Sequence, residues 1–366
     1  MKQKLIAVAA LLATGSSFAQ VTLTGQMGFS WQQSPVVAAD GSHVQGLSMN
    51  DGDIYVTATE DLGGGYSATA RGGVVLRGRG TAIADRDGTV GLATPMGSLT
   101  LGNLRACGPL DAVKSGAVTG TVYTANETVL QVPLDKCSLI DVVSYTSPKF
   151  SDISLNAIYG EFNDSAATNQ KGNTTGLTFG VLGATYAKGP IMATADYTAY
   201  AATKSISQPA GPTSAPGFIT ALNGWSRVRL AGTYDAGVAK VGLGYQTWTW
   251  GKADQYLASL AIPYGNILLG VDYMARAAQG AATKGTATEN AAVDLASSLL
   301  SGTKNGDTAS SALGLGATYM FSKTTNVNAS YITYTDAGKN VNPTTGAVTY
   351  TGQLDTEYRI RLLKTF

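Results

Sequence analysis

Apolar and polar residues alternate along most of this chain. In the clearest segment, residues 21–32, the even positions carry small polar residues, glutamine or glycine, and the odd positions carry Val21, Leu23, Gly25, Met27, Phe29 and Trp31. Successive side chains of a β-strand point to opposite faces of a sheet. This period of two therefore predicts a strand with one apolar and one polar face.

Later segments repeat this alternation, and several of them carry a tyrosine near one end of the apolar face. They cover residues 153–159, 191–198, 227–234, 267–274 and 313–319. The whole chain holds 18 Tyr but only 8 Phe. Tyrosine at strand ends is typical of a membrane interface, whereas a soluble core would concentrate leucine and phenylalanine. We therefore expect the apolar faces to meet lipid.

Short and long connections alternate between the predicted strands. The short ones contain residues 61–65, 94–97, 147–149, 188–190, 235–237, 263–266 and 321–323. The long ones lie around residues 33–50, 104–138, 161–175, 201–224, 277–309 and 335–352. Short turns on one side and long loops on the other are typical of outer-membrane barrels. The pattern predicts an all-β fold, a transmembrane antiparallel β-barrel of about sixteen strands around an aqueous channel. A soluble secreted β-sandwich is the alternative.

The first residues predict export. Lys2 and Lys4 precede an apolar run over residues 5–13, and small residues then lead to Ala19. This is the order of a secretory signal peptide that is cleaved after Ala19. The apolar run is about half the length that spans a bilayer, which argues against an N-terminal anchor. We expect residues 1–19 to be the signal peptide and residues 20–366 to form the outer-membrane barrel.

Composition agrees with this prediction. Charged residues make up 13% of the chain, about half the usual share of a soluble domain. No later stretch approaches the roughly 18 apolar residues of a transmembrane helix. The formal net charge of +1 argues against a nucleic-acid partner.

The residues that carry enzyme or metal chemistry are scarce. His43 is the single histidine, and Cys107 and Cys137 are the only cysteines. In an exported protein we expect the two cysteines to form a disulfide, so no metal constellation remains. Gly63–Gly65 lies in a strand-to-strand turn with no following Lys-Ser/Thr pair, which excludes a phosphate loop. We expect no enzyme, no catalytic site and no cofactor.

Six short motifs resemble those of the Gram-negative general porins, in particular the branch common in β-proteobacteria. They are residues 60–66 (EDLGGGY), 86–92 (RDGTVGL), 97–102 (GSLTLG), 143–150 (VSYTSPKF), 234–240 (YDAGVAK) and 319–325 (YMFSKTT). They occur in family order over essentially the whole mature chain, which ends on Phe366. The resemblance implies a sixteen-stranded barrel, a homotrimer, and contact with outer-membrane lipid and lipopolysaccharide.

The resemblance also implies that a third external loop folds into the lumen as a constriction. In this chain that loop is expected after Gly102 and before Asp141. Cys107 and Cys137 both fall inside it, so a disulfide between them would restrict its movement.

The family sets basic residues of the pore wall against acidic residues of this loop, and the resulting field selects polar over apolar solutes. Arg86 matches the wall arginine of the fourth strand. Asp53 stands in the second strand where the family has basic residues, and Asn103 stands where it usually has arginine. These departures remove the basis for assigning the family's typical anion preference. The candidate constriction residues are Asp53, Arg71, Arg86, Arg105, Asp111, Glu127 and Asp135, and the candidate lumen-lining residues are Arg227, Arg229, Arg359 and Arg361.

The predicted function is a water-filled channel for passive diffusion of small hydrophilic solutes and ions. Two alternatives are a substrate-selective outer-membrane channel and a closed barrel that acts as a surface receptor or anchor. The polar inward face, rich in glycine and threonine, favours an open lumen. A closed barrel of this size would need a plug domain, for which the sequence offers no segment.

Overall fold

The computed structural model describes residues 19–38, 40–77, 84–106, 110–119, 138–163, 174–202, 224, 226–248, 254–277, 309–336, 339–341, 348–350 and 354–366. The strands are β1 (Gln20–Val37), β2 (His43–Gly63), β3 (Tyr66–Val75), β4 (Ala84–Thr94), β5 (Gly97–Ala106), β6 (Ser138–Thr146), β7 (Ile153–Asn163), β8 (Thr174–Lys188), β9 (Ile191–Ala202), β10 (Ser226–Asp235), β11 (Lys240–Trp248), β12 (Gln255–Tyr264), β13 (Ile267–Arg276), β14 (Ser310–Ser322), β15 (Thr325–Thr335), β16 (Lys339–Val341), β17 (Val348–Tyr350) and β18 (Thr356–Thr365). One short 3-10 helix, η1 (Asp111–Val113), follows β5. In these ranges no helix is long and apolar enough to cross a membrane.

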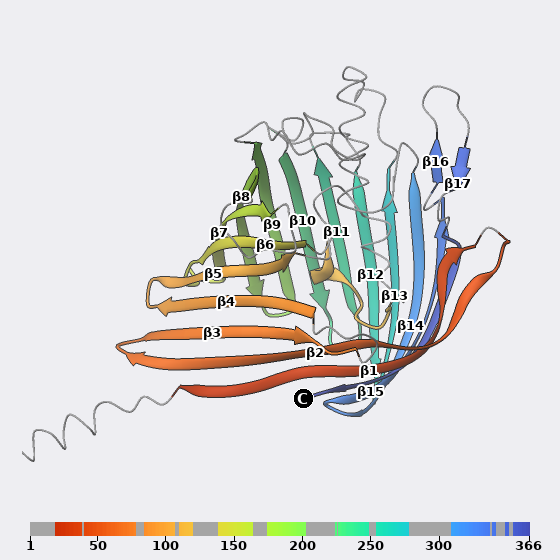
Figure 1. Ribbon diagram of the computed structural model, residues 1–366, viewed down its shortest axis with the longest axis horizontal. Helices are drawn as coiled ribbons and strands as arrows, with labels where there is room; N and C mark the ends of the chain where they lie inside the picture. The colour runs from red at the N-terminus through yellow and green to blue at the C-terminus, as the bar shows by residue number, and fades with distance from the viewer. Residues whose placement is uncertain are drawn as a thin grey trace, which may run out of the picture.

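Within the described residues, β1 to β15 and β18 form a closed antiparallel barrel of 16 strands (Figure 1). Neighbouring strands follow the chain order, except that β18 lies between β15 and β1. Strands of a barrel tilt against its axis, so strands on its two sides cross in projection. Figure 1 shows this crossing between the wall of β2–β5 and the wall of β10–β14. The predicted fold class and strand number are confirmed.

The last strand closes the barrel against the first. β1 and β18 pair from Gln26 with Thr365 to Gln33 with Tyr358. At the end of this ladder, Gly25 N donates to Phe366 O at 2.9 Å and Phe366 N donates to Gly25 O at 3.0 Å. Closure leaves neither β1 nor β18 with an unpaired edge. A barrel in lipid needs this closure, because lipid tails offer no hydrogen bonds to unpaired backbone groups.

The alternation in the sequence separates an outward from an inward face. On β1, Leu23 and Phe29 are exposed while Ser30 is 1% exposed. On β13, Leu269 and Val271 are exposed while Asp272 and Met274 are each 1% exposed. Outward positions therefore carry large apolar side chains, as in outer-membrane barrels. Inward positions carry polar side chains together with some apolar ones, such as Met274.

Glycine makes the tightest turn between two strands. Gly64 and Gly65 connect β2 to β3 with φ angles of 63° and 82°, the backbone that a two-residue hairpin turn requires at both positions. Because these angles are costly for other residues, this part of the EDLGGGY motif is explained by turn geometry alone.

The first long connection was predicted wrongly. Instead of a loop over residues 33–50, β1 and β2 continue to pair until Val37 faces His43. β1 includes Pro35, although proline cannot donate to a sheet ladder. The true turn is short and is held by Asp40, whose carboxylate accepts from the hydroxyl (2.6 Å) and the backbone N–H (3.0 Å) of Ser42. These bonds lower the pKa of Asp40.

The last predicted loop, residues 335–352, also contains structure. β16 and β17 form a separate two-stranded sheet outside the barrel, with Lys339 facing Tyr350. Figure 1 shows this hairpin beyond the end of the barrel wall.

Candidate functional site

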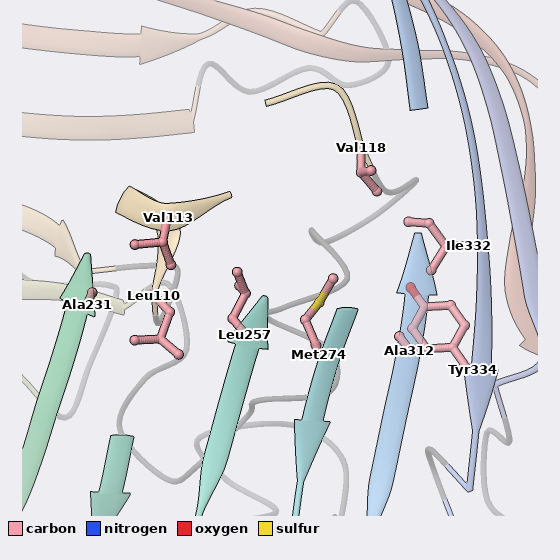
Figure 2. Packing of buried hydrophobic residues seen from close by; sticks show 9 residues of the cluster. All are labelled: Leu110, Val113, Val118, Ala231, Leu257, Met274, Ala312, Ile332 and Tyr334. Atoms are coloured by element: carbon pink, nitrogen blue, oxygen red, sulfur yellow. The ribbon is translucent and has the colours of Figure 1, made fainter. Parts of the chain in front are cut away.

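Residues 110–119 run along the inner side of the barrel wall. η1 contacts β10, β11 and β12, and Leu110, Val113 and Val118 are buried against apolar side chains that point inward from the wall. The wall side chains of this cluster are Ala231, Leu257, Met274, Ala312, Ile332 and Tyr334 (Figure 2). Each fully buried leucine or valine contributes roughly 1.5–3 kcal/mol. The segment is thus attached to the wall by a small apolar core.

Glycines of the wall leave room for this segment. A side chain on Gly242 would place Cβ 2.1 Å from the carbonyl oxygen of Val113, and one on Gly316 would place it 2.1 Å from that of Ala117. Gly270 and Gly314 face Ser115 and Val118 in the same way. No real Cβ atom comes so close to a backbone oxygen, so the path of the segment depends on glycine in β11, β13 and β14.

Hydrogen bonds fix the same segment along its length. Ser115 N donates to Asp272 Oδ1 at 2.8 Å in a buried position. Asn328 Nδ2 donates to Ala117 O at 2.7 Å, and Thr119 Oγ1 donates to Asn328 Oδ1 at 2.6 Å. The hydroxyl of Ser259 donates to Val113 O. Three of these four bonds satisfy backbone groups of the segment, at Val113, Ser115 and Ala117, which would otherwise be buried without partners.

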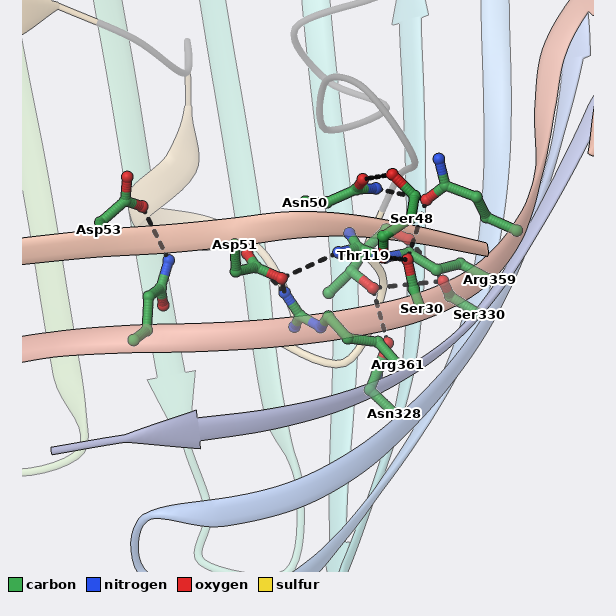
Figure 3. Close-up of polar contacts among 12 residues, drawn as sticks. Ser30, Ser48, Asn50, Asp51, Asp53, Thr119, Asn328, Ser330, Arg359 and Arg361 are labelled. Carbon is green, nitrogen blue, oxygen red and sulfur yellow. Dashed lines mark hydrogen bonds and ion pairs between the residues drawn. The ribbon is translucent and has the colours of Figure 1, made fainter. Parts of the chain in front are cut away.

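A carboxylate beside the end of this segment joins two arginines of the inner wall (Figure 3). Asp51 Oδ2 lies 3.0 Å from Arg359 Nη2 and 3.1 Å from Arg361 Nη1. Asp51 belongs to β2 and the arginines belong to β18, so its side chain crosses β1. Gly28 permits this crossing, because a Cβ there would lie 2.5 Å from Asp51 Oδ2. Two guanidinium groups thus contact the same carboxylate on the lumen wall.

Two predicted constriction residues lie on the inner face of β2 and β3. Asp53 is 9% exposed and accepts a hydrogen bond from Gln26 Nε2 at 3.1 Å. The Arg71 guanidinium lies 3.9 Å from the centre of the Tyr55 ring, a distance at which a cation is attracted to the ring face.

A polar row crosses the opposite wall. Arg229 pairs in register with Asp196 and with Gln246, and its Nε donates to Gln246 Oε1 at 2.9 Å. Gln246 then donates to Gln255, which faces Arg276 on β13. In the next row, Arg227 Nη2 donates to Thr198 Oγ1 at 3.0 Å and lies 3.6 Å from Asp196. The inner face therefore carries alternating charged and amide groups.

One acidic residue predicted for the loop lies in the described segment. Asp111 begins η1, is exposed, and forms an ion pair of 2.7 Å with Lys114. Its charge is therefore largely balanced within the segment.

Other predicted residues lie outside the part of the chain whose side chains are described. Arg86 and Arg105 have described backbone in β4 and β5, but their side chains fall outside. Glu127, Asp135, Cys107 and Cys137 fall outside the described residues altogether.

Sequence reasoning missed Asp51, Asp272 and Asn328. A signal for Asp51 was present, because it shares the inward parity of Asp53. Its contacts with Arg359 and Arg361 can be predicted only when the pairing of β1 with both β2 and β18 is known. Asp272 and Asn328 sit at inward positions too, but their partner is a segment whose path the strand pattern does not give.

The family model of the Gram-negative porins matches residues 6–339 of this chain. The chain belongs to the Gram-negative porin family. Its structure agrees with solved porins at low sequence identity. The anion-selective porin from Comamonas acidovorans has 17% identity and a TM-score of 0.61 over 95% of this chain and 100% of that chain.

Two further solved porins support the fold. OmpT, an outer membrane protein of Vibrio cholerae, solved in a trimer form, has 14% identity and a TM-score of 0.60 over 95% of this chain and 99% of that one. A mutant of the Rh. blastica porin has 13% identity and a TM-score of 0.57 over 95% of this chain and 100% of that chain. No curated protein matches the sequence of this porin.

Family and fold together make this porin an outer-membrane channel. They indicate transport rather than catalysis. Among the described residues, no group of three or more His, Cys, Asp or Glu side chains is arranged to hold a metal ion.

Proposed function

We propose that this porin is a homotrimeric diffusion channel that admits small hydrophilic solutes and ions and narrows where residues 110–119 run along the wall. The supporting observation is the inner face, where arginines, carboxylates and amides line a closed barrel of 16 strands. A barrel of this size encloses an aqueous channel rather than a solid core. The trimeric state follows the solved porin of Vibrio cholerae, and the outward apolar face implies contact with outer-membrane lipid and lipopolysaccharide.

The constriction in this proposal is formed by two charged groups. Asp51, Arg359 and Arg361 lie beside Thr119, at one end of the inner segment (Figure 3). Asp53 lies two residues after Asp51 on β2, and Arg71 lies on the neighbouring β3. Because opposite charges are arranged around the lumen, a polar solute would be favoured over an apolar one of equal size.

Osmotic swelling of proteoliposomes tests the diffusion function. Uncharged sugars of increasing size would be supplied outside vesicles that contain the refolded protein. We expect the swelling rate to fall steadily with sugar size, because passage is limited by width rather than by recognition. Vesicles that do not swell even in the smallest sugar would contradict an open channel and favour a closed receptor or anchoring barrel.

The proposal includes maturation and a disulfide. Residues 1–19 would be removed by signal peptidase, so the mass of the mature protein should correspond to a chain that begins at Gln20. Cys107 and Cys137 would pair within the connection between β5 and β6. Alkylation of the denatured, non-reduced protein should then label neither cysteine, while alkylation after reduction should label both; labelling of both without reduction would contradict the pairing.

A further inference from the structure

An apolar patch covers part of the inner wall, where a water-filled barrel is normally polar. Its side chains are Leu104, Ile140, Val142, Ile158, Phe179 and Val181, from four consecutive strands, β5 to β8. Leu104 faces Ile140 in register, and Ile158 faces Val181. The outward positions of the same strands also carry apolar residues, such as Val143 and Leu182. This wall is therefore apolar on both faces.

An aromatic ring gives the patch a fixed surface. The ring of Phe179 lies over Gly160, where an added Cβ would come within 2.2 Å of the ring. The same ring packs against Tyr200, with the two centroids 6.0 Å apart and the planes tilted by 39°. Gly160 thus lets the Phe179 ring lie against the wall, which leaves the ring in place to contact a solute.

A cavity of about 520 Å³ lies between this patch, the beginning of the inner segment and the wall of β9 and β10. Its size falls in the range of small-molecule sites. Arg227, Arg229 and Asp196 line it together with the apolar patch. Hydrogen bonds to Thr198 and Gln246 hold the two guanidinium groups in position.

The charge at this cavity favours an anion. Among the described residues that line the cavity, the charged groups are Arg227, Arg229, Asp196 and Asp111. Asp196 lies 3.6 Å from Arg227, and Asp111 lies 2.7 Å from Lys114, so these described groups carry a net positive charge. Arginine presents several donors and binds carboxylates with two parallel hydrogen bonds. An apolar wall with a cationic end matches a solute that has an apolar body and one carboxylate.

We propose that this cavity is a transit site for small organic anions with an apolar body, with arylcarboxylates as the simplest case. The Phe179 wall contacts the ring while Arg227 and Arg229 bind the carboxylate. The inference rests on the proposed channel function and adds selectivity to it. A short dwell beside the constriction would raise the local concentration of such anions over that of small inorganic ones.

Current block in planar bilayers tests this site. Channels are first recorded in KCl, and benzoate, acetate or benzylamine is then titrated in. We expect benzoate to reduce the single-channel current by half at a concentration about tenfold below that of acetate, since benzoate buries a ring and acetate has none. Benzylamine, which has the ring but the opposite charge, should reduce the current least.

Variants assign the effect to the cavity. Phe179→Ala should remove most of the tenfold preference for benzoate over acetate, and Arg229→Gln should weaken the block by both carboxylates. The matched control is Phe321→Ala, which removes the same kind of ring from an outward position that is 62% exposed. It should change neither the preference for benzoate nor the block by the two carboxylates. If Phe179→Ala forms no channel in KCl, Val181→Thr places a hydroxyl in the same patch at nearly constant volume and should reduce the preference.

The outcomes separate this inference from the function on which it rests. Equal block by benzoate and acetate in a channel that conducts KCl would overturn the transit site and leave the diffusion function intact. A preference that survives both Phe179→Ala and Val181→Thr would also overturn it. Failure of the native protein to conduct KCl would instead contradict the channel itself.

Discussion

At the scale of single residues, the charge that a permeating ion meets depends on pairing as much as on the number of arginines. Arg359 and Arg361 are on adjacent inward positions of β18, and both contact Asp51. The three groups are shielded from solvent, with side chains 6%, 13% and 14% exposed. In such a setting the carboxylate that both arginines contact offsets part of the repulsion between the two guanidinium groups.

The substitution Asp51→Asn should make the pore more anion-selective. It leaves two neighbouring guanidinium groups without their shared carboxylate, so the reversal potential in a KCl gradient should shift toward that of chloride. The same change should lower the free energy of unfolding by about 3 kcal/mol, because a partly buried charge loses its partner.

Asp152→Asn is the control for this prediction. Asp152 pairs with Lys188 at 2.9 Å next to a short turn, so its substitution removes an equal charge at a distance from Asp51. It should leave the reversal potential where it is. An unchanged potential in Asp51→Asn would show that this cluster does not face the ion path.

Strand parity predicted which side of the wall a residue occupies, but not its partner. Arg227, Arg229, Arg359 and Arg361 lie on the inner face as their alternation indicates. The carboxylate of Asp51 reaches its arginines across β1, a contact between residues about three hundred positions apart. Such contacts depend on barrel closure and register, which no local pattern contains.

At the scale of elements, the inner segment and the wall are complementary. Residues 110–119 supply apolar side chains and backbone groups, and the wall supplies glycines, Asp272 and Asn328. A glycine in a strand normally weakens it, because no side chain packs there. Here the lost side-chain packing is offset because glycine lets the inner segment approach the strand backbone closely.

The substitution Gly316→Ala should displace the inner segment. Its Cβ would lie 2.1 Å from Ala117 O, and relieving such an overlap typically costs 1–3 kcal/mol. We expect noisier and more variable single-channel currents, while the barrel still inserts into bilayers. Gly72→Ala is the matched control, because nothing lies within 4 Å of the added Cβ. Identical currents in both variants would show that the segment does not narrow the pore.

The connection between β5 and β6 is only partly predictable from the sequence. The resemblance placed a constriction loop between Gly102 and Asp141, and the described part of that connection does lie along the inner wall. The strand pattern does not show which wall glycines make room for the inner segment, because isolated glycines occur throughout the strands of this chain. The predicted loop at residues 33–50 failed for a related reason, since turn-forming residues do not exclude strand pairing when the neighbouring ladder continues.

At the scale of the whole molecule, the chain is a barrel with reversed polarity: apolar on the outside, and polar over most of the inside except at the inner segment and the patch on β5 to β8. This arrangement is stable only in a bilayer, where the outward leucines, valines and tyrosines meet lipid. The alternation therefore predicted the membrane location together with the fold.

The substitution Leu230→Arg should be costly in lipid. Leu230 is an outward residue in the middle of β10, and arginine at the bilayer midplane of a barrel costs about 2–4 kcal/mol. Leu62→Arg provides the comparison, because Leu62 is also outward but lies beside the turn after β2, where the cost is roughly 0–1 kcal/mol. Unfolding by urea in lipid vesicles measures both. Equal costs would contradict the membrane placement of β10.

We infer that this porin forms an open channel whose wall charges set its ion preference. Conductance of the purified protein in a planar bilayer, under a salt gradient, tests it most directly. We expect discrete steps that appear in groups of three, with a reversal potential that Asp51→Asn moves toward the chloride value. A protein that inserts as a folded barrel but gives no steps would contradict the account.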